Sequence, residues 1–328
     1  MEDVLNNLGR VFPDQSFSHQ EAINVKGGGA SSIFIGNGGQ VFDTQIFKEE
    51  AVDTAPLLII QPAIRLQGRV LVGELDGFTT SFVNIATEQL EATVNQHTVI
   101  VDRWMDFLSK NGLYLADFTL KPKLEQASWG NVSGVKIYTL KFNYKGLELG
   151  VANFAQIPQK TRPTLTQSDI TFGLERIIWA INKNSRYYEI IGPVLNALRG
   201  EDIVMDAYRT STLITASGVH PGVDEQGSKL RGLIQRYSTL EQDFNPDIVR
   251  YYYNWWSKFA RFPLEINETV HLLRSESERM RNIQITQILQ ENGVSGLPPA
   301  SKTHPTEKLI SGLSSDEIDI LRRKMTNN

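Results

Sequence analysis

Hydrophobic and polar positions repeat with two different periods along the chain. In its first part, short apolar runs stand between glycine-rich turns, as in residues 31–36 (SSIFIG) and 55–62 (APLLIIQP), and this pattern predicts strands. Residues 135–157 alternate and turn at residues 144–146 (YKG), which predicts an antiparallel hairpin. Residues 98–110 place apolar side chains at helical spacing. Together these elements indicate an antiparallel sheet with helices against it, the α+β class.

After about residue 191 the period becomes that of helices. The segments from there to residue 293 have helical periodicity and few strand signals. Residues 296–308 (GLPPASKTHPTEK) resemble a linker before one last short helix. The sequence therefore predicts two domains, residues 1–194 around the sheet and residues 195–328 built from helices.

The composition of the chain excludes several kinds of chemistry. The chain of 328 residues has a formal net charge of -4, so no overall basic field indicates nucleic-acid binding. It has no cysteine, which excludes disulfides and thiol nucleophiles, and its five histidines lack the paired spacing of a metal site. The N-terminus is unlike a secretory signal, and no apolar run approaches the ~20 residues of a membrane span. We expect a cytoplasmic protein without a dedicated metal site.

One predicted helix begins with an unusual pair of charges. Residues 169–182 (DITFGLERIIWAIN) lead from a polar turn through a glycine into this short helix. Glu175 and Arg176 lie in its first turn, where the helix dipole disfavours positive charge. A surface salt bridge would explain Arg176, and so would an anion bound beside it.

Three further residues each allow two interpretations. Arg65 follows an apolar strand and either reaches out to solvent or binds a phosphate with its planar guanidinium. Asp169 either caps the helix that follows or holds an ammonium group. Trp129 stands among small and turn residues, at the edge of a core or in the wall of a pocket.

Residues 250–262 (RYYYNWWSKFARF) interleave aromatic with basic side chains. Such a stretch could stack nucleobases. Val249, Tyr252, Trp256 and Phe259 are nevertheless at the spacing of a helical core, which favours packing over stacking.

The order and spacing of these segments resemble the catalytic core of class II aminoacyl-tRNA synthetases, specifically of archaeal-type alanyl-tRNA synthetases. Residues 31–42 (SSIFIGNGGQVF) are similar to the family's first conserved strand region. Residues 61–68 (QPAIRLQG) and 78–86 (FTTSFVNIA) are similar to motif 2, and residues 169–180 (DITFGLERIIWA) are similar to motif 3. Residues 206–237 resemble the family's helical domain, so the likeness covers most of the chain.

The resemblance implies a nucleotide site. In it, Arg65 would contact the α-phosphate of ATP and Arg176 the terminal phosphate. Together with Mg²⁺, they would neutralise the charge that builds up as pyrophosphate leaves. Phe82 and Glu175 would complete the nucleotide contacts.

The resemblance also implies a pocket for an amino acid. Trp129 would wall this pocket, and Asp169 would take the α-amino group of the substrate. Thr171 and Gly173 would stand beside the substrate's side chain. The branched threonine replaces a family glycine there and would either favour a small substrate or reshape the pocket for a different one.

Several positions depart from the family pattern. Val223 stands where the family has an asparagine that helps to recognise the acceptor stem of tRNA. Glu74 and Gly77 lie in a loop that is usually rich in arginine, and the loss of basic residues weakens the attraction to RNA phosphates. Val83 replaces an acidic residue after Phe82.

These observations lead to a hypothesis: the chain is a ligase that adenylates a small amino acid, such as alanine or glycine. It would pass this group to an acceptor other than cognate alanine tRNA, such as a carrier-protein thiol or a small-molecule or peptide amine. Two alternatives stay open. Val83 and Thr171 suggest a non-catalytic regulatory paralogue that binds an amino acid. A minimal synthetase that charges a tRNA is suggested by basic residues of the helical region, namely Arg209, Lys229, Arg231 and Arg236.

Overall fold

The structure is a computed structural model and describes residues 1–27, 32–161, 163–182, 186–192, 201–238, 243–293 and 313–326. Its contacts divide the chain into two compact units. The first comprises Met1–Ala197 with Trp256–Arg261, and the second comprises Leu198–Trp255 with Phe262–Asn328. The predicted boundary between residues 194 and 195 lies outside the described residues, so this division stays a prediction.

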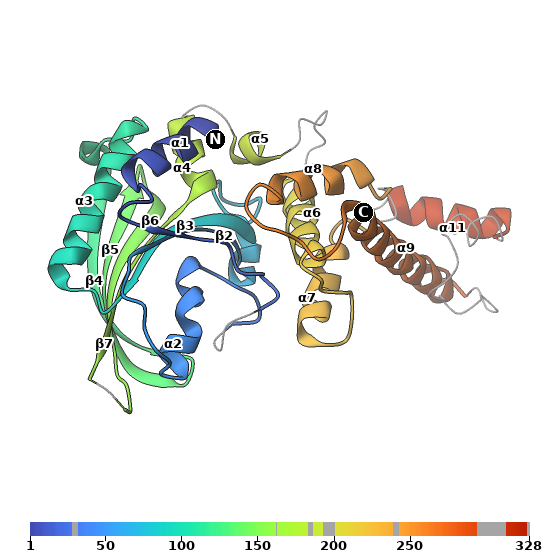
Figure 1. The fold of residues 1–328 in the computed structure, drawn as a ribbon. Helices are drawn as coiled ribbons and strands as arrows, with labels where there is room; N and C mark the ends of the chain where they lie inside the picture. The colour runs from blue at the N-terminus through green and yellow to red at the C-terminus, as the bar shows by residue number, and fades with distance from the viewer. Residues whose placement is uncertain are drawn as a thin grey trace. The chain divides into compact units, whose positions relative to one another are not determined.

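The first unit is built around one seven-stranded sheet with the order β1-β2-β3-β7-β6-β5-β4 (Figure 1). β1 pairs with β2 in parallel, and all other neighbours are antiparallel. The strands are β1 (Ser18–Gln20), β2 (Leu57–Ile64), β3 (Ser81–Leu90), β4 (Phe118–Trp129), β5 (Val132–Tyr144), β6 (Leu147–Ile157) and β7 (Leu165–Gly173). The helical elements are α1 (Glu2–Val11), η1 (Gly38–Phe42), α2 (Asp43–Phe47), η2 (Leu66–Val70), α3 (Val94–Lys110), η3 (Leu115–Asp117), α4 (Leu174–Ile181) and α5 (Tyr187–Ile191). The α+β class is confirmed.

The structure confirms the elements that were predicted from the most regular patterns. The apolar run in residues 55–62 becomes β2, which is buried along nearly its whole length. The predicted hairpin is β5 and β6, and Lys145 and Gly146 have φ angles of 47° and 91° in the turn between them. Positive φ at both central residues matches the twist of the strands. The predicted helix is α3, which starts at Val94 after a capping box formed by Thr93 and Gln96.

Two local predictions were wrong. Residues 32–36 form no strand, although Phe34 and Ile35 are buried. Ile35 exchanges only single backbone hydrogen bonds with Val25 and Ile64, so packing rather than sheet pairing holds this run. Residues 169–173, predicted as a polar turn, are the end of β7, because β3 and β6 pair with them on both sides.

Trp104 of α3 anchors one face of the sheet. Its ring stacks on Phe172 of β7 with centroids 4.6 Å apart, and its Nε1 donates to Thr87 Oγ1 at 2.8 Å. Phe12, which follows α1, packs on the same ring at 5.0 Å. Helices α1 and α3 therefore cover this face of the sheet.

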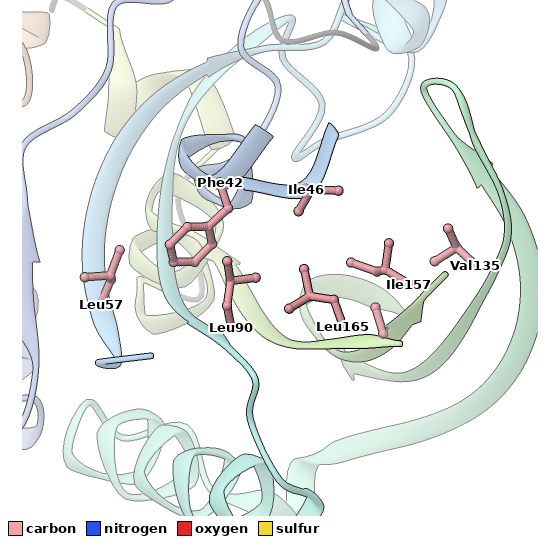
Figure 2. Close-up of a cluster of buried hydrophobic side chains, with 8 residues drawn as sticks. Phe42, Ile46, Leu57, Leu90, Val135, Ile157 and Leu165 are labelled. Atoms are coloured by element: carbon pink, nitrogen blue, oxygen red, sulfur yellow. The ribbon is translucent and has the colours of Figure 1, made fainter. Parts of the chain in front are cut away.

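The opposite face carries an apolar cluster at one end of the strands (Figure 2). Phe42 of η1 and Ile46 of α2 pack there against side chains from five strands. We name this group the Phe42 cluster: Phe42, Ile46, Leu57, Leu90, Val135, Ala155, Ile157 and Leu165. Burial of each large member contributes roughly 1.5–3 kcal/mol to stability.

The second unit is helical: α6 (Glu201–Ala216), α7 (Glu225–Ile234), α8 (Pro246–Trp256), α9 (Ile266–Glu291) and α11 (Ser315–Thr326). The last of these is the predicted final helix, whereas the predicted linker at residues 296–308 lies outside the described residues. Val249 and Tyr252 are fully buried, so the aromatic stretch packs as its spacing indicates. None of the described helices is long and apolar enough to cross a membrane.

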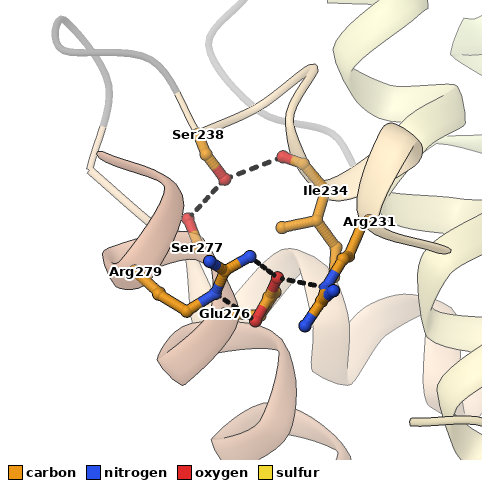
Figure 3. Close-up of polar contacts among 6 residues, drawn as sticks. All are labelled: Arg231, Ile234, Ser238, Glu276, Ser277 and Arg279. Atoms are coloured by element: carbon orange, nitrogen blue, oxygen red, sulfur yellow. Dashed lines mark hydrogen bonds and ion pairs between the residues drawn. The ribbon is translucent and has the colours of Figure 1, made fainter. Parts of the chain in front are cut away.

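Basic side chains of this unit take part in its internal packing. Arg209 is 0 % exposed, and its guanidinium lies 5.7 Å and 5.3 Å from the rings of Tyr252 and Trp255. Figure 3 shows Arg231 of α7, whose Nε donates to Glu276 of α9 at 3.0 Å. Glu276 also accepts hydrogen bonds from Arg279, at 2.5 Å and 2.9 Å. Arg209 and Arg231 therefore have structural partners.

Candidate functional site

A cavity of about 620 Å³ lies beside the Phe42 cluster, on the same face of the sheet. Along β7, Leu165 belongs to the cluster, whereas Asp169 and Thr171 line the cavity. Alternate residues of a strand point to one face, so these three side chains lie on one side. The segment from Gln67 to Thr79 and the start of α4 form the other walls.

The structure brings most of the predicted site residues together in this cavity. Its lining includes Arg65, Phe82, Asp169, Thr171, Gly173, Glu175 and Arg176. They come from three neighbouring strands and from α4, which directly follows β7. Residues from distant parts of the sequence therefore line one cavity.

Trp129 does not join them. It lies at the end of β4 and packs against the Phe42 cluster, with its ring centroid 6.4 Å from that of Phe47. Gly130 follows in a left-handed conformation, with φ 56°, against the same Phe47 ring. The structure thus places Trp129 at the edge of a core.

Arg65 directly follows the last residue of β2. Its Nε donates to the carbonyl oxygen of Gly36 at 2.8 Å, and its guanidinium lies 5.1 Å from the ring centroid of Phe82. Its terminal amino groups have no hydrogen-bond partner among the described residues. Burial lowers the pKa of Arg65, and nearby Asp169 opposes this effect. A guanidinium remains charged under such conditions, so Arg65 presents unused donors to the cavity.

The contacts of Arg176 explain why a positive charge lies in the first turn of α4. Its Nε donates to the Gly77 carbonyl oxygen at 2.9 Å and its Nη1 to the Glu148 carbonyl oxygen at 2.6 Å. The guanidinium also lies 5.2 Å from the ring centroid of Phe78. These contacts replace the surface salt bridge and hold the cation at the cavity wall.

Glu175 secures the junction between β3 and α4. Both of its carboxylate oxygens accept from the backbone N–H of Val83 at 3.0 Å, and its side chain is buried. The pairing of β3 with β7 ends at Asn84 and Gly173, so Val83 has no β7 partner. The carboxylate thus takes the place of a strand carbonyl. This contact between Glu175 and the backbone of Val83 stabilises the junction of β3 and α4.

Asp169 lies within a polar row that crosses the sheet. Thr139 Oγ1 donates to Asn153 Oδ1 at 2.8 Å, and Asn153 Nδ2 donates to Asp169 Oδ2 at 3.0 Å. On its other side Asp169 pairs across strands with Glu88, to which Gln167 Nε2 donates at 3.0 Å. The capping interpretation is wrong, because Asp169 is a strand residue and Gly173 is the residue before the helix.

The residues that sequence analysis missed are members of this row: Thr139, Asn153, Gln167 and Glu88. Each lies on the strand face that also carries the Phe42 cluster, in a strand whose sequence mixes polar and apolar residues. No single polar residue therefore stood out in the sequence, and the register that aligns these side chains requires knowledge of strand pairing.

Comparison with known proteins adds a distant likeness. No known protein family and no curated protein matches the sequence. The chain has distant structural similarity to class II aminoacyl-tRNA synthetase catalytic domains. One is the pyrrolysyl-tRNA synthetase PylSc of Desulfitobacterium hafniense, at 13% identity and a TM-score of 0.39, over 61% of this chain and 74% of that chain.

A second similar structure is the Giardia lamblia prolyl-tRNA synthetase in complex with prolyl-adenylate. Its identity is 10% and its TM-score 0.30, over 72% of this chain and 60% of that chain. The Cryptosporidium parvum prolyl-tRNA synthetase with L-proline and AMP has 10% identity and a TM-score of 0.23, over 72% and 59% of the two chains. These similarities concern the fold and give no specific link to alanyl-tRNA synthetases.

Proposed function

We propose that this protein activates a small amino acid with ATP to form an enzyme-bound aminoacyl adenylate. The observation that carries the proposal is the convergence of Arg65, Arg176 and Asp169 in one cavity. Two guanidinium groups suit a polyphosphate, and a carboxylate suits an ammonium group. An amino acid and ATP together supply those charges.

The reaction needs little acid–base chemistry. A carboxylate oxygen of the amino acid attacks the α-phosphorus and forms a new P–O bond. The bond from that phosphorus to the β-phosphate bridging oxygen breaks, and pyrophosphate leaves with the electron pair. Arg65 would bind the α-phosphate and Arg176 the terminal phosphate, so that both oppose the growing negative charge.

The cavity residues are compatible with Mg²⁺ carried by the nucleotide. Mg²⁺ usually binds substrate phosphates, waters and one or two carboxylates. The cavity carboxylates Glu125 and Glu148 are paired with Lys123 at 2.5 Å and Lys141 at 2.8 Å, and Glu175 is bound to Val83. The phosphates would therefore hold the ion more than the chain would, and its role would be to neutralise their charge.

A small amino acid fits the cavity floor best. Thr171 is 7 % exposed and lies in β7 between Asp169 and Gly173, where its branched side chain takes up space. Alanine, glycine or a residue of similar size would leave room for the nucleotide. Asp169 would receive its α-amino group, and Phe82, with Arg65 against its ring, would contact the nucleotide.

The acceptor we favour is not cognate alanine tRNA. Of the basic residues that suggest tRNA binding, Arg209 is buried and Arg231 is paired with Glu276. Val223 is 94 % exposed, where the family would recognise an acceptor stem with asparagine. Buried or paired cations contribute little to RNA phosphate binding. A carrier-protein thiol or a small-molecule or peptide amine remains the proposed acceptor.

The test is amino-acid-dependent ATP–pyrophosphate exchange over the twenty standard amino acids. We expect exchange with one small amino acid, and its loss in Arg65→Ala. The absence of exchange with every amino acid would overturn the proposal. Calorimetry with ATP would then test the regulatory alternative, and aminoacylation of total tRNA tests the synthetase alternative.

A further inference from the structure

Two carboxyl groups lie next to each other on the face of the sheet that carries the cavity. Glu88 of β3 and Asp169 of β7 are cross-strand partners, and Glu88 is 0 % exposed. Side chains directly opposite each other on one sheet face have Cβ atoms about 4.5–5.5 Å apart. These two carboxyl groups therefore contact each other away from bulk water.

In each of the two carboxyl groups, one oxygen accepts a hydrogen bond from a neighbouring amide and the other oxygen does not. Gln167 donates to Glu88 Oε2, and Asn153 donates to Asp169 Oδ2. Glu88 Oε1 and Asp169 Oδ1 are buried and receive no hydrogen bond from any donor in the described residues. Two acceptors that face each other need a proton between them, because a carboxylate has no donor of its own.

The surrounding charges agree with one retained proton. Burial raises the pKa of Glu88 well above its ordinary value, and neighbouring Asp169 raises it further. Burial also raises the pKa of Asp169, whereas hydrogen bonds from Glu88 and Asn153 and the charge of Arg65 oppose this. The other charged groups in the cavity lining are Glu125 of β4, Lys141 of β5, Glu148 of β6, and Glu175 and Arg176 of α4. The proton therefore belongs on Glu88.

We propose that Glu88 is held as the neutral acid and donates a hydrogen bond to Asp169, so that the pair presents one negative charge to an ammonium group. This inference deepens the proposed function and rests on it for the identity of the amine. Glu88 is a positioning residue, because it lies behind Asp169 and is absent from the cavity lining. With Asn153 on the other oxygen, it fixes the orientation of the Asp169 carboxylate.

The first experiment needs no substrate. Since the pKa of Glu88 is higher in the folded than in the unfolded chain, the stability that Glu88 contributes decreases as pH rises above about 4.3. Glu88→Gln supplies a neutral donor without a titrating proton. Its Tm relative to wild type should therefore rise between about pH 5 and pH 9, by roughly 2–4 °C or more.

The control is Glu125→Gln, which removes another cavity carboxylate, one paired with Lys123. Its Tm difference from wild type should stay constant over the same pH range. If the Tm profiles of wild type and Glu88→Gln were parallel, the proposal that Glu88 keeps its proton would be overturned. This outcome does not depend on whether the protein has adenylating activity.

The second experiment measures KM for the amino acid in pyrophosphate exchange. Glu88→Ala should raise KM roughly tenfold with little change in kcat, because Asp169 loses a hydrogen bond that orients it. Glu88→Gln should restore the wild-type KM. Equal KM values for Ala and Gln variants would overturn the positioning role, whereas a wild type without exchange would count against the proposed function alone.

Discussion

The two ends of one sheet face make an informative comparison. At one end, Leu90 of β3 and Ala155 of β6 pack in the Phe42 cluster. Two residues away on the same strands and the same face, Glu88 and Asn153 belong to the polar row. Leu90 and Glu88 are each 0 % exposed, so the two strands bury an apolar side chain at one end and a carboxyl group at the other.

The two ends differ in what burial costs. Burial of Leu90 stabilises the fold through the transfer of apolar surface from water. Burial of Glu88 costs free energy unless hydrogen bonds and a proton compensate for it. Continuing the apolar cluster would avoid this cost, and the polar end is where the proposed binding site lies.

The largest effect is expected at the cavity end. Arg65→Ala should lower the kcat for pyrophosphate exchange by roughly 10²–10³-fold, the usual loss when one preorganised donor to a developing charge is removed. The initial rate of ATP–pyrophosphate exchange at saturating ATP measures this loss of kcat. Arg103→Ala is the matched control, because Arg103 lies against Phe17 at 5.4 Å and outside the cavity lining. Equal kcat values for the two variants would remove Arg65 from the reaction.

The cluster end should respond in stability. Leu90→Ala should lower the free energy of unfolding by about 2–5 kcal/mol, because it leaves a cavity in a packed group. Urea unfolding measures this loss. Leu75→Ala, at a side chain that is 53 % exposed, should change stability by less than about 0.5 kcal/mol. If both variants lost the same free energy, the Phe42 cluster would not be the core of this face.

Asn153→Leu extends the apolar end into the polar row. Asp169 Oδ2 and Thr139 Oγ1 each lose a partner, so the free energy of unfolding should fall by roughly 1–3 kcal/mol. KM for the amino acid should rise as well. Gln156→Leu on the opposite face of β6 is the control and should leave KM unchanged. A stabilised Asn153→Leu protein with wild-type KM would show that the row serves no ligand.

The smallest effect is expected for Trp129→Phe. The phenyl ring keeps most of the contact with the Phe42 cluster, so stability should fall by less than about 1.5 kcal/mol. KM for the amino acid should not change, because Trp129 lies outside the cavity lining. A clear rise in KM would restore the pocket-wall role that the family resemblance implies.

Local patterns allowed much of the fold to be predicted. β2 and the β5–β6 hairpin follow from an apolar run and from alternation around a turn, which depend on neighbouring residues only. The run at residues 32–36 has a similar pattern but no strand partner, so its backbone remains irregular. Apolar character alone indicated burial there, not sheet pairing.

The sequence by itself determined β2, the β5–β6 hairpin, the helices α3 and α4 and the two short motifs that contain Arg65 and Arg176. Each depends on residues close together in the chain, where spacing and side-chain chemistry are visible directly. Only the tertiary structure decided that Glu88 stands opposite Asp169 and that Trp129 packs with Phe47. The first contact depends on strand register, and a shift of one residue would turn every side chain to the other face of the sheet. The second depends on how α2 packs against the end of β4.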